Sequence, residues 1–223
     1  MKKIILAGNA ITAQILQHYL RQDLRYEVVA TVVDQPFLAL NKCLDVPSVS
    51  TTEILNRFPV DDHAVIMAIG YDDLNKVRES LFHRVKGLGY RIETYIHPDA
   101  CVYTENPLGE GCVVLPGAVL EPHVHVGSNC MVWCNATLAH HSYVGENCWV
   151  ASGAVISGQA RIGCNTFIGV NATVVNNIAV GEFNIIGGGA LITKSTKASS
   201  VHLARSAEVF RYSAEEYTKY FSV

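Results

Sequence analysis

An aliphatic side chain recurs at every sixth position through the second half of the chain. Steps of six from Ile96 to Ile192 meet seventeen positions, and every one holds isoleucine, valine or leucine. Four places after these positions the residue is usually small, as at Cys112, Ala118 and Ala154. A strict short period of this kind predicts a solenoid of short strands, in which stacked coils share one continuous core.

A glycine marks every third hexapeptide. It follows the aliphatic residue at a strict period of 18, at positions 109, 127, 145, 163 and 181. Three hexapeptides therefore form one coil of a triangular prism, with the aliphatic side chain inward and the small residue beside it. We expect these glycines to relieve backbone strain at one recurring corner. Residues one such period apart should stack in adjacent coils, about 4.8 Å from each other.

The first 95 residues show alternating apolar strands and amphipathic helices. Strands are predicted at 3–7, 27–33 and 64–69, and helices at 10–21 and near 73–87. This alternation is typical of a small parallel sheet covered by helices. The side chains expected to face the sheet from the first helix are Ile11, Ile15, Leu16 and Leu20.

The chain leaves the repeat after Ile192 and ends in a helical pattern. Apolar residues at helical spacing predict a helix at 206–221, which we expect to cap the last coil or to pack on a neighbouring subunit. The sequence thus divides into an α/β domain at 1–95, a prism at 96–200 and a tail at 201–223.

Composition and charge narrow the class of protein. The formal net charge is −3, which gives no electrostatic reason to expect a nucleic acid or an anionic membrane as partner. The apolar run near Met1 spans only about five residues, too short for a secretory signal, and no stretch is long enough to span a membrane. We therefore expect a soluble, cytoplasmic protein. Its seven cysteines should be thiols, although the regular spacing of Cys112, Cys130 and Cys148 would by itself permit a disulfide.

Polar residues in the first domain are one candidate for chemistry. Gly8, after the first predicted strand, supplies only one of the three glycines of a dinucleotide fingerprint, which argues against NAD. Asp34 ends the second predicted strand, where open α/β sheets bind ligands, and could accept a hydrogen bond from a ribose or a base. A solvated turn aspartate is the alternative.

A pair of histidines in the prism is the second candidate. His140 precedes Gly158 by one full coil, and His123 precedes His141 by the same interval, so the members of each pair should stack. An imidazole beside a glycine N–H suits acyl transfer, because one group takes the proton of the nucleophile and the other stabilises the oxyanion. A solvated surface histidine is the plain alternative.

The repeat and the segment around His140 resemble a known family. The segment Leu138-Ala139-His140-His141-Ser142-Tyr143-Val144-Gly145 aligns without a gap to the motif hydrophobic-x-His-Asp/Glu-x-x-Ile-Gly of bacterial nucleotide-sugar N-acetyltransferases, a group that also contains sialic acid O-acetyltransferases. The resemblance covers both the α/β domain and the prism. It implies a Rossmann-like α/β domain that binds the nucleotide-sugar, an all-β left-handed parallel β-helix and a short C-terminal helix. It also implies a homotrimer that binds acetyl-CoA between neighbouring prisms and uses no metal.

The resemblance also gives roles to residues. It makes His140 the general base and Gly158 the donor of the oxyanion amide. His141 stands where the family has an acidic residue, so either a carboxylate from another subunit substitutes or the base is weaker than usual. By the same match acetyl-CoA would contact Trp149, Val170 and Gly188, and the nucleotide-sugar would bind near Gly8, Ala10, Ile11, Thr12, Asp34 and Gln35.

Four functions follow from these observations. We favour N-acetylation of a nucleotide-linked 4-amino-4,6-dideoxy sugar, because an alcohol needs a base more than an amine does. O-acetylation of a sugar such as sialic acid is the second hypothesis, and a non-catalytic trimer that binds sugar nucleotides is the third. The fourth is zinc chemistry of the γ-carbonic anhydrase kind, which needs three converging imidazoles. His123, His125, His140 and His141 supply the nitrogens, but their spacing does not match that family.

Overall fold

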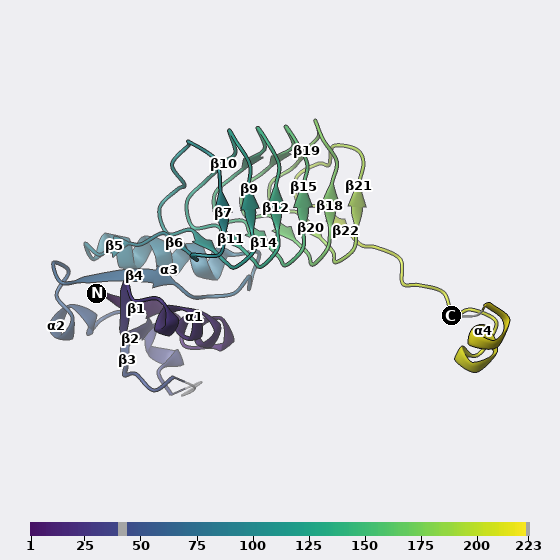
Figure 1. Ribbon diagram of the computed structural model, residues 1–223. Helices are drawn as coiled ribbons and strands as arrows, with labels where there is room; N and C mark the ends of the chain where they lie inside the picture. The colour runs from purple at the N-terminus through teal and green to yellow at the C-terminus, as the bar shows by residue number, and fades with distance from the viewer. Residues whose placement is uncertain (40–43, 222–223) are drawn as a thin grey trace.

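The computed structural model describes residues 1–39 and 44–221. Figure 1 shows three parts in chain order: an α/β domain, a prism of stacked coils beside it, and a C-terminal helix that stands apart. The α/β sheet, the parallel β-helix and the short last helix are the architecture predicted from the sequence, and the structure confirms it.

The N-terminal domain contains a parallel sheet of five strands in the order β3-β2-β1-β4-β5. The three strands and two helices predicted for this region are all present. The ends of β1, β2 and β4 lie side by side at one edge of the sheet, which places Gly8, Asp34 and Ala68 together. The elements are β1 (Lys2–Ala7), α1 (Ile11–Gln22), β2 (Tyr26–Val33), the 3-10 helix η1 (Gln35–Phe37), β3 (Ser48–Ser50), α2 (Ile54–Arg57), β4 (His63–Met67), α3 (Lys76–Gly87) and β5 (Arg91–Ile92).

The inward face of α1 differs from the prediction at its first residue. Leu16 and Leu20 are buried as expected, but Ile11 is 71% exposed and Ile15 is only partly buried. The buried face runs through Thr12, Leu16 and Leu20, with its neighbours Ala13 and Gln17 beside it. Ile11 and Ile15 lie at the margin of this face, so the predicted phase of the helix was shifted by about one position.

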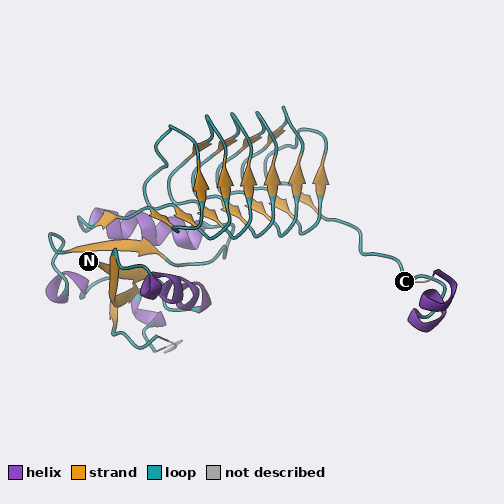
Figure 2. Ribbon diagram, in the orientation of Figure 1, coloured by secondary structure: helices purple, strands orange, loops and turns teal. Residues whose placement is uncertain are grey.

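The prism consists of very short strands joined by tight corners, and Figure 2 shows them as stacked arrows. The strands pair in parallel with the equivalent strands of adjacent coils, as Val132 does with Val114 and Val150. This confirms the predicted coil of three hexapeptides. The strands are β6 (Tyr95–Ile96), β7 (Cys101–Val102), β8 (Val113–Val114), β9 (Val119–Leu120), β10 (His125–Val126), β11 (Met131–Val132), β12 (Thr137–Leu138), β13 (Tyr143–Val144), β14 (Trp149–Val150), β15 (Val155–Ile156), β16 (Arg161–Ile162), β17 (Phe167–Ile168), β18 (Thr173–Val174), β19 (Ala179–Val180), β20 (Ile185–Ile186), β21 (Leu191–Ile192) and β22 (Val201–His202).

The interior of the prism is built by the six-residue repeat. The aliphatic side chains at every sixth position from Val114 to Ile192 are buried. Cys112, Cys130 and Cys148 stack among them as thiols, and each donates through Sγ to a carbonyl oxygen of the following turn, at 3.0, 3.0 and 3.1 Å. Burial raises the pKa of the Cys148 thiol, which keeps it protonated. Thr166 takes the next place in the column and donates through Oγ1 to the Gly181 carbonyl at 3.1 Å.

The glycines at a period of 18 have a different role from the one predicted. None of the glycines at 109, 127, 145, 163 and 181 has a φ in the left-handed region. A Cβ on Gly109 would instead lie 2.3 Å from the backbone nitrogen of Ser128, and one on Gly145 would lie 2.8 Å from that of Cys164. These glycines therefore allow close approach of successive coils, and the expectation that they relieve strain was wrong.

The left-handed residues of the prism occupy a different register. Every sixth residue from Gly111 to Gly189 has a φ between 53° and 73°. Most of these residues are asparagine or glycine, which tolerate the left-handed conformation best. The exceptions in this series are His123, His141, Gln159 and Phe183.

Arg78 of α3 connects the N-terminal domain to the prism by hydrogen bonds. Its buried guanidinium donates to the carbonyl oxygens of Gly70, Asn129 and Asn147 at 2.9, 3.2 and 2.9 Å, and to that of Cys148 at 3.3 Å. Burial lowers its pKa to about 10, so it stays charged at neutral pH. No carboxylate of the residues described forms an ion pair with this side chain. Its charge is therefore stabilised by carbonyl dipoles from both parts of the molecule.

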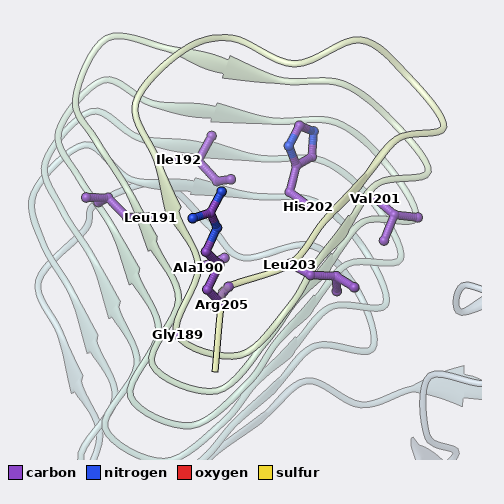
Figure 3. Close-up of a pocket in the computed structure, with 9 residues that line it drawn as sticks. Gly189, Ala190, Leu191, Ile192, Val201, His202, Leu203 and Arg205 are labelled. Atoms are coloured by element: carbon purple, nitrogen blue, oxygen red, sulfur yellow. The ribbon is translucent and has the colours of Figure 1, made fainter. Parts of the chain in front are cut away.

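The far end of the prism is open. The hollow there has a volume of about 610 Å³, and in Figure 3 Ile192 and His202 point into the last coil while Leu191 and Val201 point outward. The tail leaves from this end and forms α4 (Ala214–Phe221), shorter than the helix predicted at 206–221. Figure 1 shows α4 well away from the prism, so it does not cap the last coil of its own chain.

Candidate active site

His140 and Gly158 meet at one edge of the prism. Both lie in the corner that follows a strand, His140 after β12 and Gly158 after β15 in the next coil. A Cβ placed on Gly158 would lie 2.6 Å from Cε1 and 2.7 Å from Nε2 of His140. The imidazole therefore rests against the glycine backbone, and any side chain at position 158 would displace it. His140 itself is exposed at the surface.

The backbone amides of His140 and Gly158 differ in their hydrogen bonding. The N–H of His140 donates to Oε2 of Glu121 at 2.7 Å. The N–H of Gly158 has no acceptor anywhere in the part of the chain that the structure describes. A free amide beside an exposed imidazole is the pairing that stabilises an oxyanion while a base removes a proton.

His140 is connected through His141 to a histidine of the preceding coil, His123. Nδ1 of His140 lies 3.3 Å from Nδ1 of His141. The ring of His141 packs on that of His123, with centroids 4.6 Å apart. Nδ1 of His123 lies 3.4 Å from Oε2 of Glu105. Glu105 precedes His123 by one coil period, so the coil register could have identified it from the sequence.

Two of the three residues expected to contact acetyl-CoA lie at a different edge, and the third, Trp149, is in strand β14. Val170 and Gly188 occupy successive corners that precede β18 and β21, and both are exposed. Their N–H groups have no acceptor within the described residues, which leaves them free for a ligand carbonyl. Trp149 is only 5% exposed, because its ring packs against Trp133 and Tyr71 with centroids 5.0 and 5.1 Å away. That placement leaves little of the indole for a ligand, and its contact with acetyl-CoA stays a prediction.

One full face of the prism separates these two edges. The corner that contains Val170 precedes the sheet of β9, β12, β15 and β18, and the corner that contains His140 follows it. A face of about six residues spans about 20 Å at the rise of a β-strand. The histidine edge and the Val170 edge of one copy therefore lie too far apart to meet at one small reacting group.

A cavity of about 290 Å³ lies at the carboxyl edge of the N-terminal sheet. Of the residues predicted to bind a nucleotide-sugar, Gly8, Ala10 and Asp34 line it. Ile11, Thr12 and Gln35 do not: the Ile11 side chain is largely exposed, Thr12 lies on the buried face of α1 and Gln35 is exposed. The remaining lining residues are Asn9, Val33, Phe37, Ala68, Ile69, Gly70, Asp72, Val77 and Leu81.

Gly8 and Asp34 are both constrained by their neighbours. A Cβ on Gly8, whose φ is 130°, would lie 2.5 Å from the Ala68 carbonyl oxygen, so only glycine fits this turn. The Asp34 carboxylate forms an ion pair with Arg84 and accepts from Thr51 Oγ1 at 3.2 Å. Asp34 therefore meets a ligand with part of its hydrogen-bonding capacity already used. Phe37 and Asp72 escaped the sequence analysis because they lie outside the predicted strands and helices.

The described residues form neither a metal-binding cluster nor a helix suited to a membrane. Among the residues at 1–39 and 44–221, no three His, Cys, Asp or Glu side chains converge closely enough to hold a metal ion. No helix in these ranges is long and apolar enough to cross a membrane.

Comparison with known proteins identifies the fold. Residues 108–140 and 123–158 match the family described as bacterial transferase hexapeptide (six repeats). A search of curated protein sequences finds no significant match.

Solved structures resemble the chain over nearly its whole length. The acetyltransferase domain of PglB from Neisseria gonorrhoeae FA1090 is 23% identical, with a TM-score of 0.80 over 94% of this chain and 100% of its own. A variant of perosamine N-acetyltransferase from Caulobacter crescentus, in complex with CoA and GDP-perosamine, is also 23% identical, with a TM-score of 0.80 over 91% and 93%. WeeI from Acinetobacter baumannii AYE is 22% identical, with a TM-score of 0.79 over 93% and 99%. Residues 108–158 thus match the hexapeptide transferase family, and the chain as a whole has the fold shared by these three proteins.

Proposed function

We propose that this protein is an acetyl-CoA-dependent N-acetyltransferase that acts as a homotrimer on a nucleotide-linked amino sugar, of the 4-amino-4,6-dideoxy class. The observation that carries the proposal is the exposed His140 imidazole packed against Gly158, whose N–H has no acceptor in the described residues. The similar structures support the choice of substrates, because one is described with acetyl-CoA and another with CoA and GDP-perosamine.

The chemistry follows from the two groups at the histidine edge. The sugar amine attacks the carbonyl carbon of the thioester directly, and no acyl-enzyme forms. Nε2 of His140 takes the proton that the nitrogen loses as the new C–N bond forms. The Gly158 N–H donates to the carbonyl oxygen as it becomes negative. The C–S bond then breaks, and the thiolate of CoA takes up the proton.

The two ligands would bind on different parts of the assembly. Helix α1 begins at the cavity of the N-terminal domain, where its dipole and the N–H groups of its first two residues favour a phosphate. Acetyl-CoA would lie in the groove between two prisms, against the amides of Val170 and Gly188. The acetyl group would then reach His140 of the neighbouring copy, so each site would need two subunits of the proposed trimer.

Transfer to an amine fits the histidine edge better than transfer to an alcohol. No carboxylate among the described residues bonds to the imidazole of His140, since Glu121 accepts only its backbone N–H. An amine has a nucleophilic lone pair before it loses a proton, whereas an alcohol depends on the base for its nucleophilicity.

Thiol release from acetyl-CoA tests this proposal. The acceptors are 4-amino-4,6-dideoxy sugars linked to UDP, dTDP or GDP, with free sialic acid as the comparison. We expect release with at least one amino sugar and none with sialic acid, from a particle three times the chain mass of 24.3 kDa. Release with sialic acid alone would replace N-transfer by O-transfer. Binding of sugar nucleotides without release from any acceptor would identify a non-catalytic trimer instead.

A further inference from the structure

Three residues outside the proposed catalytic pair of His140 and Gly158 form a connected chain with it. Glu105, His123 and His141 are spaced by one coil period each, so they stack at the same corner of three successive coils. The Glu105 carboxylate is 3.4 Å from Nδ1 of His123, and the rings of His123 and His141 are 4.6 Å apart and tilted by 46°. His141 then reaches Nδ1 of His140 at 3.3 Å.

We propose that Glu105 and His123 are positioning residues that act through His141 to hold His140 in the tautomer needed for catalysis. This inference rests on the proposed function. One of the two facing Nδ1 atoms must carry a proton for the contact to be a hydrogen bond. When that proton is on His140, its Nε2 has a free lone pair and can act as the base. His141 then accepts the hydrogen bond in place of a carboxylate.

The backbone gives independent support for a functional role of the two histidines. His123 and His141 have φ values of 65° and 59°, in the left-handed series that is otherwise mostly asparagine and glycine. A larger side chain is less favourable in this conformation, and such positions persist where the side chain is used. Gln159, another exception in the series, continues the same column one coil beyond His141, whereas Phe183 lies at a different corner. The unfavourable choices therefore concentrate in the column beside His140.

Glu105 is the carboxylate at this corner that can orient the histidine rings. Glu121 is the other carboxylate at this corner, but it accepts the backbone N–H of His140. Glu105 is the one carboxylate of the described residues that forms an ion pair with His123. The His123 ring is held by this pair on one side and by the His141 ring on the other, which restricts rotation of His141.

The test compares variants in two backgrounds, with thiol release as the readout. In the wild-type background, Glu105→Gln and His123→Leu should each lower kcat on the order of tenfold, as expected for an outer partner that orients an imidazole. The KM for acetyl-CoA should change little. Glu146→Gln, at an exposed corner remote from the histidines, is the matched control and should keep the wild-type kcat.

The second background carries His141→Asp, because aspartate tolerates a left-handed φ and supplies its own carboxylate to Nδ1 of His140. We expect this variant to be active and Glu105→Gln and His123→Leu to have no further effect in it. Equal losses in both backgrounds would mean a merely structural role and overturn the inference, as would a wild-type kcat for both variants in the first background. A wild-type protein that is inactive with every acceptor would overturn the proposed function itself, and this assignment with it.

Discussion

Alanine at position 158 tests the contact on which the proposed chemistry depends. Its Cβ would lie 2.6 Å from Cε1 and 2.7 Å from Nε2 of His140, whereas carbon atoms in contact prefer about 3.5–4.0 Å. The imidazole must therefore move by roughly 1 Å or rotate away from the edge. The φ of Gly158 is not in the left-handed region, so alanine fits the backbone itself.

We expect Gly158→Ala to lower kcat by about 10²-fold, since a displacement of about 1 Å at a reacting group has an effect of that size. The free energy of unfolding should change by less than about 1 kcal/mol, because the backbone is unstrained and alanine restricts the unfolded chain. The measurements are thiol release for kcat and a thermal melt by circular dichroism for stability. Gly87→Ala is the matched control, because a Cβ on Gly87 meets no atom within 4 Å.

A wild-type kcat for Gly158→Ala, with its fold intact, would refute the reasoning, because the imidazole could not then act from the position seen here. Loss of folding in this variant alone would also count against the analysis of its backbone. A parallel loss in Gly87→Ala would point to a general sensitivity to glycine substitution.

Three further results are expected. Arg78→Met leaves the carbonyl oxygens of Gly70, Asn129 and Asn147 without a donor among the described residues, so urea unfolding should show a loss of at least roughly 3 kcal/mol. Exposed Arg57→Met should not share this loss, and an unchanged midpoint for Arg78→Met would contradict a stabilising role of these hydrogen bonds. Cys130→Ser should melt near the wild-type temperature, since a serine hydroxyl can donate to a carbonyl as that of Thr166 does. Cys130→Leu should overpack the interior of the prism and melt at a lower temperature, and equal melting temperatures for the two variants would contradict a tightly packed interior. His140→Ala should inactivate the histidine edge, and Gly188→Trp should block the edge proposed to bind acetyl-CoA. Mixing the two kinds of subunit should restore part of the activity, because some grooves then combine an intact edge from each. Mixtures without activity would contradict a site shared between subunits.

The prism could be predicted almost completely because one signal is repeated in every coil. A single very short strand gives little information, but a fixed period of 18 sets the register of all of them together, as in the pairing of Val132 with Val114 and Val150. The same register brought His140 onto Gly158. It also places Glu105 one coil from His123, and these two residues are in contact in the structure.

The features that escaped prediction depend on single contacts. A glycine can serve a left-handed turn or close packing, and the sequence does not distinguish the two at Gly109 or Gly145. The inward face of α1 had to be predicted from the pattern of a single short helix, so Ile11 was assigned to the wrong face. The hydrogen bonds of Arg78 to the prism could not be predicted, because its acceptors are main-chain carbonyls, which every residue has.

The most direct measurement of the central claim is the kcat of His140→Asn in the thiol-release assay, with the amino sugar that the wild-type protein accepts. Asparagine is polar and similar in reach but cannot take a proton at neutral pH. We predict that kcat falls by about 10²–10⁴-fold while the trimer and the binding of acetyl-CoA persist. An asparagine variant that turns over at the wild-type rate would contradict the account, because the proton would then leave the amine without His140.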